Sequence, residues 1–273
     1  MNYERVLKMK IDTVTKQNEY WNNEANTVEY EKNNFSIFDD EKAKKKIIFH
    51  LDKVIIDPAF IVGDLGCGPG HILPYLSKMC KEVIKIDYAA NMLKEAQRRN
   101  SHLRNITYRR GDMRNLGRWH GNFDVVVATN SILPGSISEA DRMIAEIHKS
   151  LKDGGVFVAV MALIETSNYL ARLKFERLIS EGISEIAAIR RIRKEYQEEK
   201  KFDGIFGFMR DGSNNLVQKY FYRDELKLML KKAGFRALSI GKLRYGWEHC
   251  RKYNYDYFPG ADEIYDWLVI AKK

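Results

Sequence analysis

The stretch that decides the fold is residues 61–70, I-V-G-D-L-G-C-G-P-G. A short apolar run ends in Asp64 and opens into three glycines, and a helix-like pattern follows from His71. The glycines are Gly66, Gly68 and Gly70. This order predicts a buried strand, a tight turn and a helix start, which together bring backbone N–H groups up to a nucleotide-like ligand. Glycine suits such a turn because a Cβ atom would block the approach and because glycine adopts positive φ readily.

A second acidic residue supports a nucleotide site. Asp87 ends the next apolar run, K-E-V-I-K-I-D, and lies 21 residues after Gly66. An acid at about this distance binds the ribose hydroxyls in dinucleotide-binding folds. The glycine spacing nevertheless departs from the nicotinamide fingerprint G-x-G-x-x-G, because the third glycine comes one residue early and His71 stands where that fingerprint has glycine. A nicotinamide-dependent dehydrogenase is therefore a disfavoured alternative.

Three segments together give the chain a family resemblance. They are D-L-G-C-G-P-G (64–70), I-D-Y-A-A-N-M-L (86–93) and R-G-D-M (110–113). In this combination the chain resembles the class I S-adenosylmethionine (SAM) methyltransferases, from about Phe60 to Met161 and again from Tyr220 to the C-terminus. The resemblance implies an enzyme that uses SAM as its cofactor.

The pattern after Phe60 predicts an α/β fold, because apolar runs alternate with helical segments. The expected strands are 60–64, 82–87, 105–110, 123–129, 155–162, 235–243 and 264–271. The expected helices are 71–80, 89–99, 137–151 and 223–233. The resemblance implies that these elements form a doubly wound, mostly parallel seven-stranded sheet whose last strand is antiparallel.

Three regions lie outside this pattern of strands and helices: residues 1–58, 163–221 and 244–262. They suggest a division of the chain into four parts. We expect a helical N-terminal cap segment over 1–58, a SAM-binding core over 59–162, a lid or substrate insertion over 163–221, and the C-terminal part of the core over 222–273. Apolar positions at helical spacing predict helix through 166–200, with a break at Gly182, and the glycines after it predict a flexible loop over 203–213. The insertion and the aromatic loop 244–262 both start on the edge of the sheet where ligands bind, which favours a substrate lid.

The resemblance implies roles for the residues of the glycine turn and of Asp87. Gly66 and Gly68 would bring the backbone against the aminoacyl part of SAM, with Gly70 completing the turn. Asp64 would meet the ammonium group, and its alternative role is to cap the turn. Asp87 would accept both ribose hydroxyls, and its alternative role is to cap the next helix.

Four further residues would hold the adenine. Tyr88 and Met92 would flank the ring, although Met92 fits plain helix packing as well. Asp112 would read the amino group, with the backbone N–H of Met113 beside it, and an ordinary loop aspartate is the alternative for Asp112.

The methyl acceptor is expected next to the segment T-N-S-I-L-P, which follows the fourth strand. Asn130, on the cofactor side, and Ser131 and Ile132, on the substrate side, occupy the family's place between the two ligands. The segment differs from the N-P-P-Y motif of many methylases that act on adenine or glutamine amino groups. Aromatic residues of the extra regions are also expected to contact the acceptor; they are Tyr20, Trp21 and Trp247.

No catalytic residue can be assigned from the sequence. Methyl transfer is an in-line displacement, which depends on alignment of the nucleophile and needs no nucleophile on the enzyme. Glu165, after the fifth strand, and His71, beside the glycine turn, are the candidates. No metal site is predicted.

Composition leaves the partner partly open. The net charge of +9 favours RNA, but the basic residues are spread over several predicted helices, and no zinc or RNA-recognition signature accompanies them. Three cysteines without a C-x-x-C pair, no signal peptide and no membrane-spanning run predict a cytoplasmic protein. We therefore expect methyl transfer to an O, N or C atom of a small, partly apolar metabolite. An RNA or protein methyltransferase and a non-catalytic SAM-binding protein remain alternatives, and the oligomeric state stays open.

Overall fold

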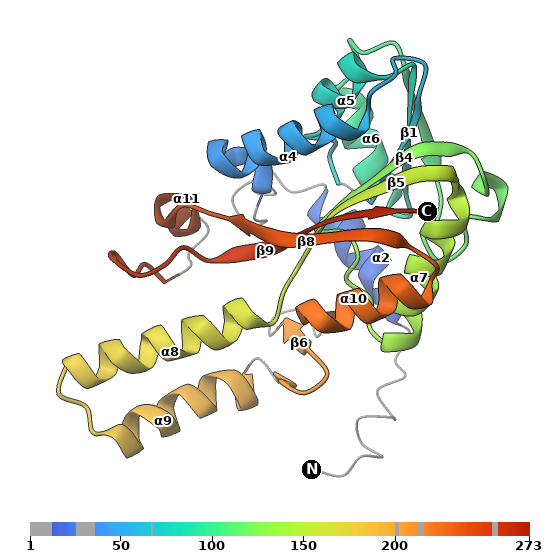
Figure 1. The fold of residues 1–273 in the computed structure, drawn as a ribbon. Coiled ribbons are helices and arrows are strands. Elements are labelled where there is room, and N and C mark those ends of the chain that lie inside the picture. Colours follow the sequence, from blue (N-terminus) through green and yellow to red (C-terminus); the bar gives the residue numbers. More distant parts are fainter. Residues whose placement is uncertain (1–12, 26–35, 67, 200–201, 212–215, 253–255) are drawn as a thin grey trace.

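The computed structural model describes residues 13–25, 36–66, 68–199, 202–211, 216–252 and 256–273. Its centre is a seven-stranded sheet in the order β3-β2-β1-β4-β5-β9-β8 (Figure 1). The strands are β1 (Ile61–Leu65), β2 (Glu82–Asp87), β3 (Ile106–Arg110), β4 (Phe123–Thr129), β5 (Leu151–Met161), β8 (Arg236–Arg244) and β9 (Tyr265–Lys272). Strands β1 to β5 pair in parallel, and β9 runs antiparallel to both β5 and β8. The predicted fold class is confirmed.

Helices cover both faces of this sheet. The helices α4 (Glu41–Val54), α5 (Leu73–Met79) and α6 (Ala90–Arg99) share one apolar core, and α7 (Ile137–Ser150) and α10 (Arg223–Lys232) share the other. The strands divide between the cores by alternation, since Val125 and Val127 belong to the first and Val126 and Ala128 to the second. The near-continuous apolar runs of the sequence are therefore strands buried on both faces.

The expected loop over 244–262 contains a short helix, α11 (Trp247–Lys252), and the predicted start of the fifth strand is also wrong. Strand β5 begins at Leu151, four residues before the expected position, and the helix before it ends at Ser150. Leu151 pairs with Phe123 across a register irregularity, and Gly154 there has a φ of +78°. Gly154 and Gly155 thus lie inside an irregular strand.

The insertion after β5 forms two helices and a hairpin. Helices α8 (Glu165–Ser180) and α9 (Glu185–Arg193) project from the sheet as an arm (Figure 1), and Gly182, with a φ of +82°, lies in the turn between them as predicted. A π-helical turn, Lys194–Glu199, follows α9. The expected loop over 203–213 is corrected in its described part, because β6 (Phe208–Asp211) pairs with β7 (Leu216–Lys219).

The N-terminal segment supplies two helices. Helix α4 has a buried apolar face, since its Ile47 and Leu51 are fully buried. Helix α2 (Thr13–Glu24) is mostly polar, and its Gln17 is buried. A short 3₁₀ helix, Ile37–Asp39, precedes α4. None of the helices in the described part of the chain is both long enough and apolar enough to cross a bilayer.

Candidate functional site

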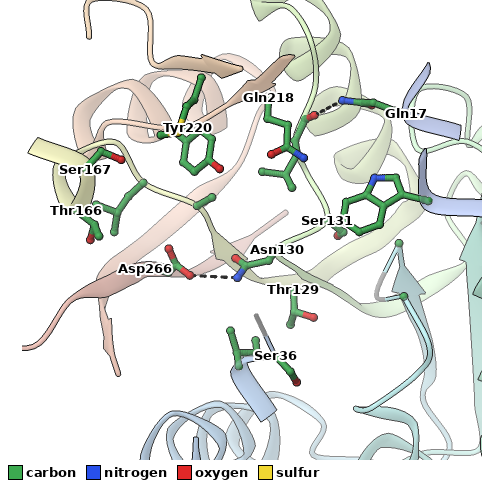
Figure 2. A pocket seen from close by; sticks show the side chains of 18 of the residues that line it. Gln17, Ser36, Thr129, Asn130, Ser131, Thr166, Ser167, Gln218, Tyr220 and Asp266 are labelled. Carbon is green, nitrogen blue, oxygen red and sulfur yellow. Dashed lines mark hydrogen bonds between the residues drawn. The ribbon is translucent and has the colours of Figure 1, made fainter. Parts of the chain in front are cut away.

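A cavity of about 770 Å³ opens at the carboxyl ends of β1, β2 and β4 (Figure 2). Its walls come from the glycine turn, α2, the beginning of α8, the β6–β7 hairpin and the start of β9. Small-molecule sites measure roughly 300–1,000 Å³, so this cavity has room for a nucleoside-sized ligand and a second small molecule.

The glycine turn forms one end of the cavity. Gly66 and Gly68 line it with φ angles of +65° and +54°, a backbone region that side-chain-bearing residues rarely adopt. A Cβ atom on Gly66 would lie 2.9 Å from both Met113 Cε and Ser131 Cβ. Gly70, with a φ of +80°, lies outside the cavity wall and packs against Leu73. The turn therefore requires glycine at Gly66 for its conformation and for its space.

Asp87 lies at the end of β2 and lines the same end. Its Oδ1 accepts a hydrogen bond of 2.9 Å from the backbone N–H of Ala89, at the start of α6. Burial raises the pKa of this carboxyl group, and Lys85 opposes that shift. Asp87 therefore caps the start of α6, and its carboxyl group also lines the cavity. Tyr88 and Met92 line the wall beside it.

The other two predicted acids differ from Asp87. Asp112 lines the cavity, but Arg114 donates to both of its carboxylate oxygens, at 2.9 Å from Nε and 2.6 Å from Nη2. Asp64 is fully buried with Lys85, whose Nζ lies 3.2 Å from its Oδ2. Asp64 does not line the cavity. Its side chain lies in the interior, next to the buried ammonium group of Lys85 on the neighbouring strand.

A polar cluster marks the opposite end of the cavity. Asn130 follows β4 with a φ of +49°, and its Nδ2 donates to Asp266 Oδ2 at 3.1 Å (Figure 2). The hydroxyl of Tyr245 donates to the same oxygen at 2.7 Å. Burial raises the pKa of Asp266 to about 6, against the opposing effect of these two donors. All three residues line the cavity.

Asp266 is a residue that sequence reasoning missed. It is the second residue of β9, and because β9 is antiparallel, its start lies at the carboxyl edge of the parallel strands. An aspartate at the beginning of a predicted antiparallel last strand was the available signal.

The predicted acceptor residues separate into two groups. Tyr20, Trp21 and Ser131 line the cavity, together with Met113 and the candidate His71. Ile132, Trp247 and Glu165 lie outside the wall: Ile132 is 2% exposed, Trp247 donates to the Ala261 carbonyl at 2.9 Å, and Glu165 accepts from the backbone N–H of Arg223 at 3.3 Å. Residues that were not predicted complete the wall; they include Thr166, Ser167, Tyr196, Met209, Gln218, Tyr220 and Tyr265.

Helix α2 is held over the glycine-turn end by amide side chains. Gln17 Nε2 donates to the carbonyl of Leu133 at 2.7 Å (Figure 2), and Asn22 pairs with Asn91 through bonds of 2.9 and 3.0 Å. These contacts join α2 to the segment after β4 and to α6.

One cationic side chain stands among the described residues of the wall. Lys174 Nζ lies 2.6 Å from Glu195 Oε1 and 2.9 Å from Asp256 Oδ2, and both acids also line the cavity. The charge of Lys174 is therefore already balanced within the protein.

Comparison with known proteins identifies the part of the chain that carries the glycine turn. Residues 62–155 match the family described as "Methyltransferase domain". We call residues 62–155 the methyltransferase domain, after the family that they match. The predicted resemblance is confirmed, and Gly66, Asp87 and Asp112 all lie within the domain.

Two relatives match part of the chain around this methyltransferase domain. An uncharacterised methyltransferase of Synechocystis is 29% identical over 120 residues, which are 44% of this chain and 55% of that protein. An uncharacterised protein encoded in a transposon of Streptomyces fradiae is 32% identical over 111 residues, which are 40% of this chain and 32% of that protein. The chain therefore matches about half of one relative and a third of the other.

Solved structures extend the likeness in fold beyond the methyltransferase domain. A SAM-dependent methyltransferase of Methanosarcina mazei superposes with a TM-score of 0.57 at 18% identity, over 83% of this chain and 96% of that one. An N-methyltransferase of Bradyrhizobium japonicum, in complex with S-adenosylhomocysteine, gives a TM-score of 0.57 at 12% identity, over 93% and 96%. At these identities the comparison establishes the fold.

Proposed function

We propose that this protein is a SAM-dependent methyltransferase that acts on a small, partly apolar molecule. The observation that carries the proposal is that one cavity contains both sets of residues. The glycine turn and Asp87 of the methyltransferase domain line one end, and Asp266 and tyrosines line the other. The family match and the structural neighbours support both the enzyme class and the cofactor.

The residues of the glycine-turn end fit the cofactor. The space that a Cβ on Gly66 would fill lets an aminoacyl group approach the backbone, and the Asp87 carboxylate faces the cavity with acceptor capacity beyond its bond to Ala89. Tyr88 and Met92 offer an aromatic face and a thioether to an adenine ring. Asp112 is held in place by Arg114, which orients it toward the same end.

The cofactor, when bound, supplies a methyl carbon made electrophilic by a sulfonium group. The residues of the chain contribute position and enclosure, since an in-line displacement is accelerated by holding the nucleophile close and aligned. Asn130 and Ser131 follow β4 and line the cavity, and the Ser131 hydroxyl is fixed by its bond of 2.7 Å to the Leu65 carbonyl. Helices α2 and α8 both contribute side chains to the wall, and an apolar wall favours a reaction in which positive charge leaves sulfur.

The wall composition supports a small acceptor over RNA. An RNA methyltransferase needs Lys and Arg side chains along an open mouth. Among the described residues of the cavity wall, Lys174 is the single Lys or Arg side chain, and two acids bind it. The charge of +9 is thus carried elsewhere on the chain. The cytoplasmic location, the four-part division of the chain and the lid role of residues 163–221 stay predictions.

Calorimetry with S-adenosylhomocysteine and with NAD tests the cofactor. We expect binding of the first and none of the second, together with a raised Tm in the presence of the first because it binds the folded state. Tight binding of NAD alone would overturn the proposal.

Labelled SAM, offered with a small-metabolite pool and with cellular RNA across a salt series, tests the acceptor. Label in small molecules is the expected result. Labelled RNA as the main product, with binding that weakens steeply with salt, would favour the RNA alternative. Cofactor binding without transfer to any acceptor would favour a binding protein.

A further inference from the structure

The acceptor end of the cavity holds more negative than positive charge. Asp266, Glu195 and Asp256 line the cavity. Lys174 contacts both Glu195 and Asp256, and Arg177, outside the wall, lies 3.5 Å from Asp256, so Asp266 is the carboxylate that no cationic side chain of the described residues neutralises. Asp266 receives hydrogen bonds from two neutral donors, Asn130 and Tyr245, and forms no ion pair with any Lys, Arg or His of the described residues. A carboxylate in such a place lacks a counterion, and a ligand cation would provide one.

The side chains around Asp266 suit a cation for a second reason. Tyr245, which contacts Asp266, and Tyr220 line the same cavity, as do Tyr265 and Tyr196, whose rings already lie beside Lys242 and Lys174. The faces of aromatic rings attract ammonium groups, and a carboxylate together with several tyrosines is a typical environment for a bound amine. An acceptor that carries a carboxylate would instead meet like charge.

We propose that the methyl acceptor is a small amine, whose nitrogen binds to Asp266 beside Tyr245 and is the atom that is methylated. This inference rests on the proposed function and adds the substrate class to it. Asp266 would be a catalytic residue, and Asn130 and Tyr245 would be positioning residues that fix the carboxylate at its Oδ2.

Asp266 also provides the proton acceptor that an ammonium group needs before it can react. One N–H bond of the ammonium breaks and its proton passes to the carboxylate, which frees the nitrogen lone pair. The lone pair then forms the N–C bond to the methyl carbon while the S–C bond breaks and its electrons stay on sulfur. Charge balances, because the sulfonium becomes a neutral thioether and the amine product becomes the cation. The raised pKa of Asp266, about 6, brings this carboxyl closer to the working range of a base near neutral pH.

Three probes that share one carbon framework test the inference by binding, without turnover. They are phenethylamine, phenethyl alcohol and hydrocinnamate, which present an ammonium, a hydroxyl and a carboxylate on the same chain. Calorimetry with the protein saturated with S-adenosylhomocysteine should rank the amine first, by about tenfold or more over the alcohol, as a charge-assisted hydrogen bond to a buried group predicts. The carboxylate should bind least.

Two variants locate the preference. Asp266→Asn keeps an oxygen for Asn130 and Tyr245, and should reduce phenethylamine binding to the level of the alcohol while S-adenosylhomocysteine still binds. Asp256→Asn removes the same charge from the same cavity at a carboxylate that Lys174 already neutralises, and should retain the amine preference. Equal binding of the three probes, or binding of none, with S-adenosylhomocysteine bound would overturn the amine acceptor and leave the proposed function standing. Failure of S-adenosylhomocysteine to bind would overturn both.

A third comparison separates the acceptor from the cofactor's own charge. If Asp266 serves the sulfonium, Asp266→Asn should weaken SAM more than S-adenosylhomocysteine and leave amine binding intact, and this result would overturn the inference. Amine binding to the unsubstituted protein gives an independent check, because it should weaken as the pH falls through about 6 and the carboxylate becomes neutral. The groups that face this carboxylate are neutral: the side chains of Tyr245 and Asn130 and the backbone N–H of Leu163.

Discussion

The two ends of the cavity are built from segments of very different separation along the chain. At the cofactor end, the glycine turn, Asp87 and Met113 come from the loops that follow β1, β2 and β3, in consecutive order. At the acceptor end, Asn130 meets Asp266, which lies 136 residues further along the chain. The first end depends on local motifs set on buried parallel strands, and the second depends on tertiary packing of the insertion and the last two strands.

The difference extends to how the walls are held. The backbone N–H of Gly66 donates to the carbonyl of Ile86, on a neighbouring strand, at 2.8 Å. The side chains of Ile86 and of Leu65, which precedes Gly66, are buried. Helix α2 is held over the cavity by the amide side chains of Gln17 and Asn22. The strands on one side of the cavity are buried, whereas α2 on the other side is held by polar side-chain contacts. This difference favours a site that opens by movement of α2.

Substitution of Asp87 is expected to have the largest effect, and it tests the cofactor end. Asp87→Ala removes the acceptor of two ribose hydroxyls, each roughly 1.5–3 kcal/mol before water compensates. We expect about a hundredfold loss of affinity for S-adenosylhomocysteine, measured by calorimetry. Asp141→Ala on the outer surface of α7, where Lys232 is the partner, is the control and should bind normally. An Asp87→Ala protein with unchanged affinity would remove this residue from the site.

Asp266→Asn tests the acceptor end through stability. The folded pKa of Asp266 is raised to about 6, so the charged carboxylate destabilises the fold, and this cost appears as the pH rises from about 4 to 6. We expect Asp266→Asn to be more stable than the unsubstituted protein above pH 6, by about 3 kcal/mol, with the difference vanishing near pH 4. Denaturant unfolding at both pH values measures it. A variant that is destabilised at high pH would show that the carboxylate serves the fold rather than the site.

Gly66→Ala sharpens the comparison at the turn itself. The positive φ costs a residue with a Cβ about 1–2 kcal/mol, and the new atom would press on Met113 and Ser131. We expect a lower Tm and weaker binding of S-adenosylhomocysteine. Gly121→Ala is the matched control, since Gly121 also has a positive φ, of +66°, but no atom within 4 Å of a Cβ. Equal loss of ligand affinity in both variants would mean that the Gly66 space does not serve the ligand.

Much of the cofactor end was predictable because each residue stands at a fixed distance from a strand end. Asp87 ends β2, the glycines and Asp112 follow β1 and β3, and parallel strands bring their carboxyl ends to one edge. Asp64 was predicted in the wall by the same logic, but the partner that draws it inward, Lys85, lies on another strand. Its side chain points into the interior, which no local pattern reveals.

The acceptor end was predictable only in part because its residues meet through long-range packing. Trp247 was expected there for its aromatic character, yet its indole packs against Phe258 at 5.9 Å between ring centroids. Tyr220 and Gln218 arrive through the β6–β7 hairpin, which the glycine pattern of residues 203–213 did not indicate. An aromatic residue on a loop satisfies the core and a ligand equally well, so its type alone does not place it.

Hydrogen exchange compares the helices α2 and α8 with the strands β1 and β4, and here we expect the smallest effect. We expect S-adenosylhomocysteine to slow exchange in α2 and α8 by several-fold, and to leave β1 and β4 unchanged because they exchange slowly already. Gln17→Ala should reduce the protection of α2 by removing its bond to Leu133. Exchange that is equally slow in α2 and α8 with and without ligand would argue against opening of the site at these two helices.

A crystal structure with S-adenosylhomocysteine bound tests the division of the cavity most directly. We expect the ribose on Asp87, the aminoacyl group at Gly66 and Gly68, and the sulfur facing Asn130 and Asp266, with the tyrosine-lined space still open beyond it. A ligand that fills the Asp266 end, or whose sulfur faces away from it, would contradict the account.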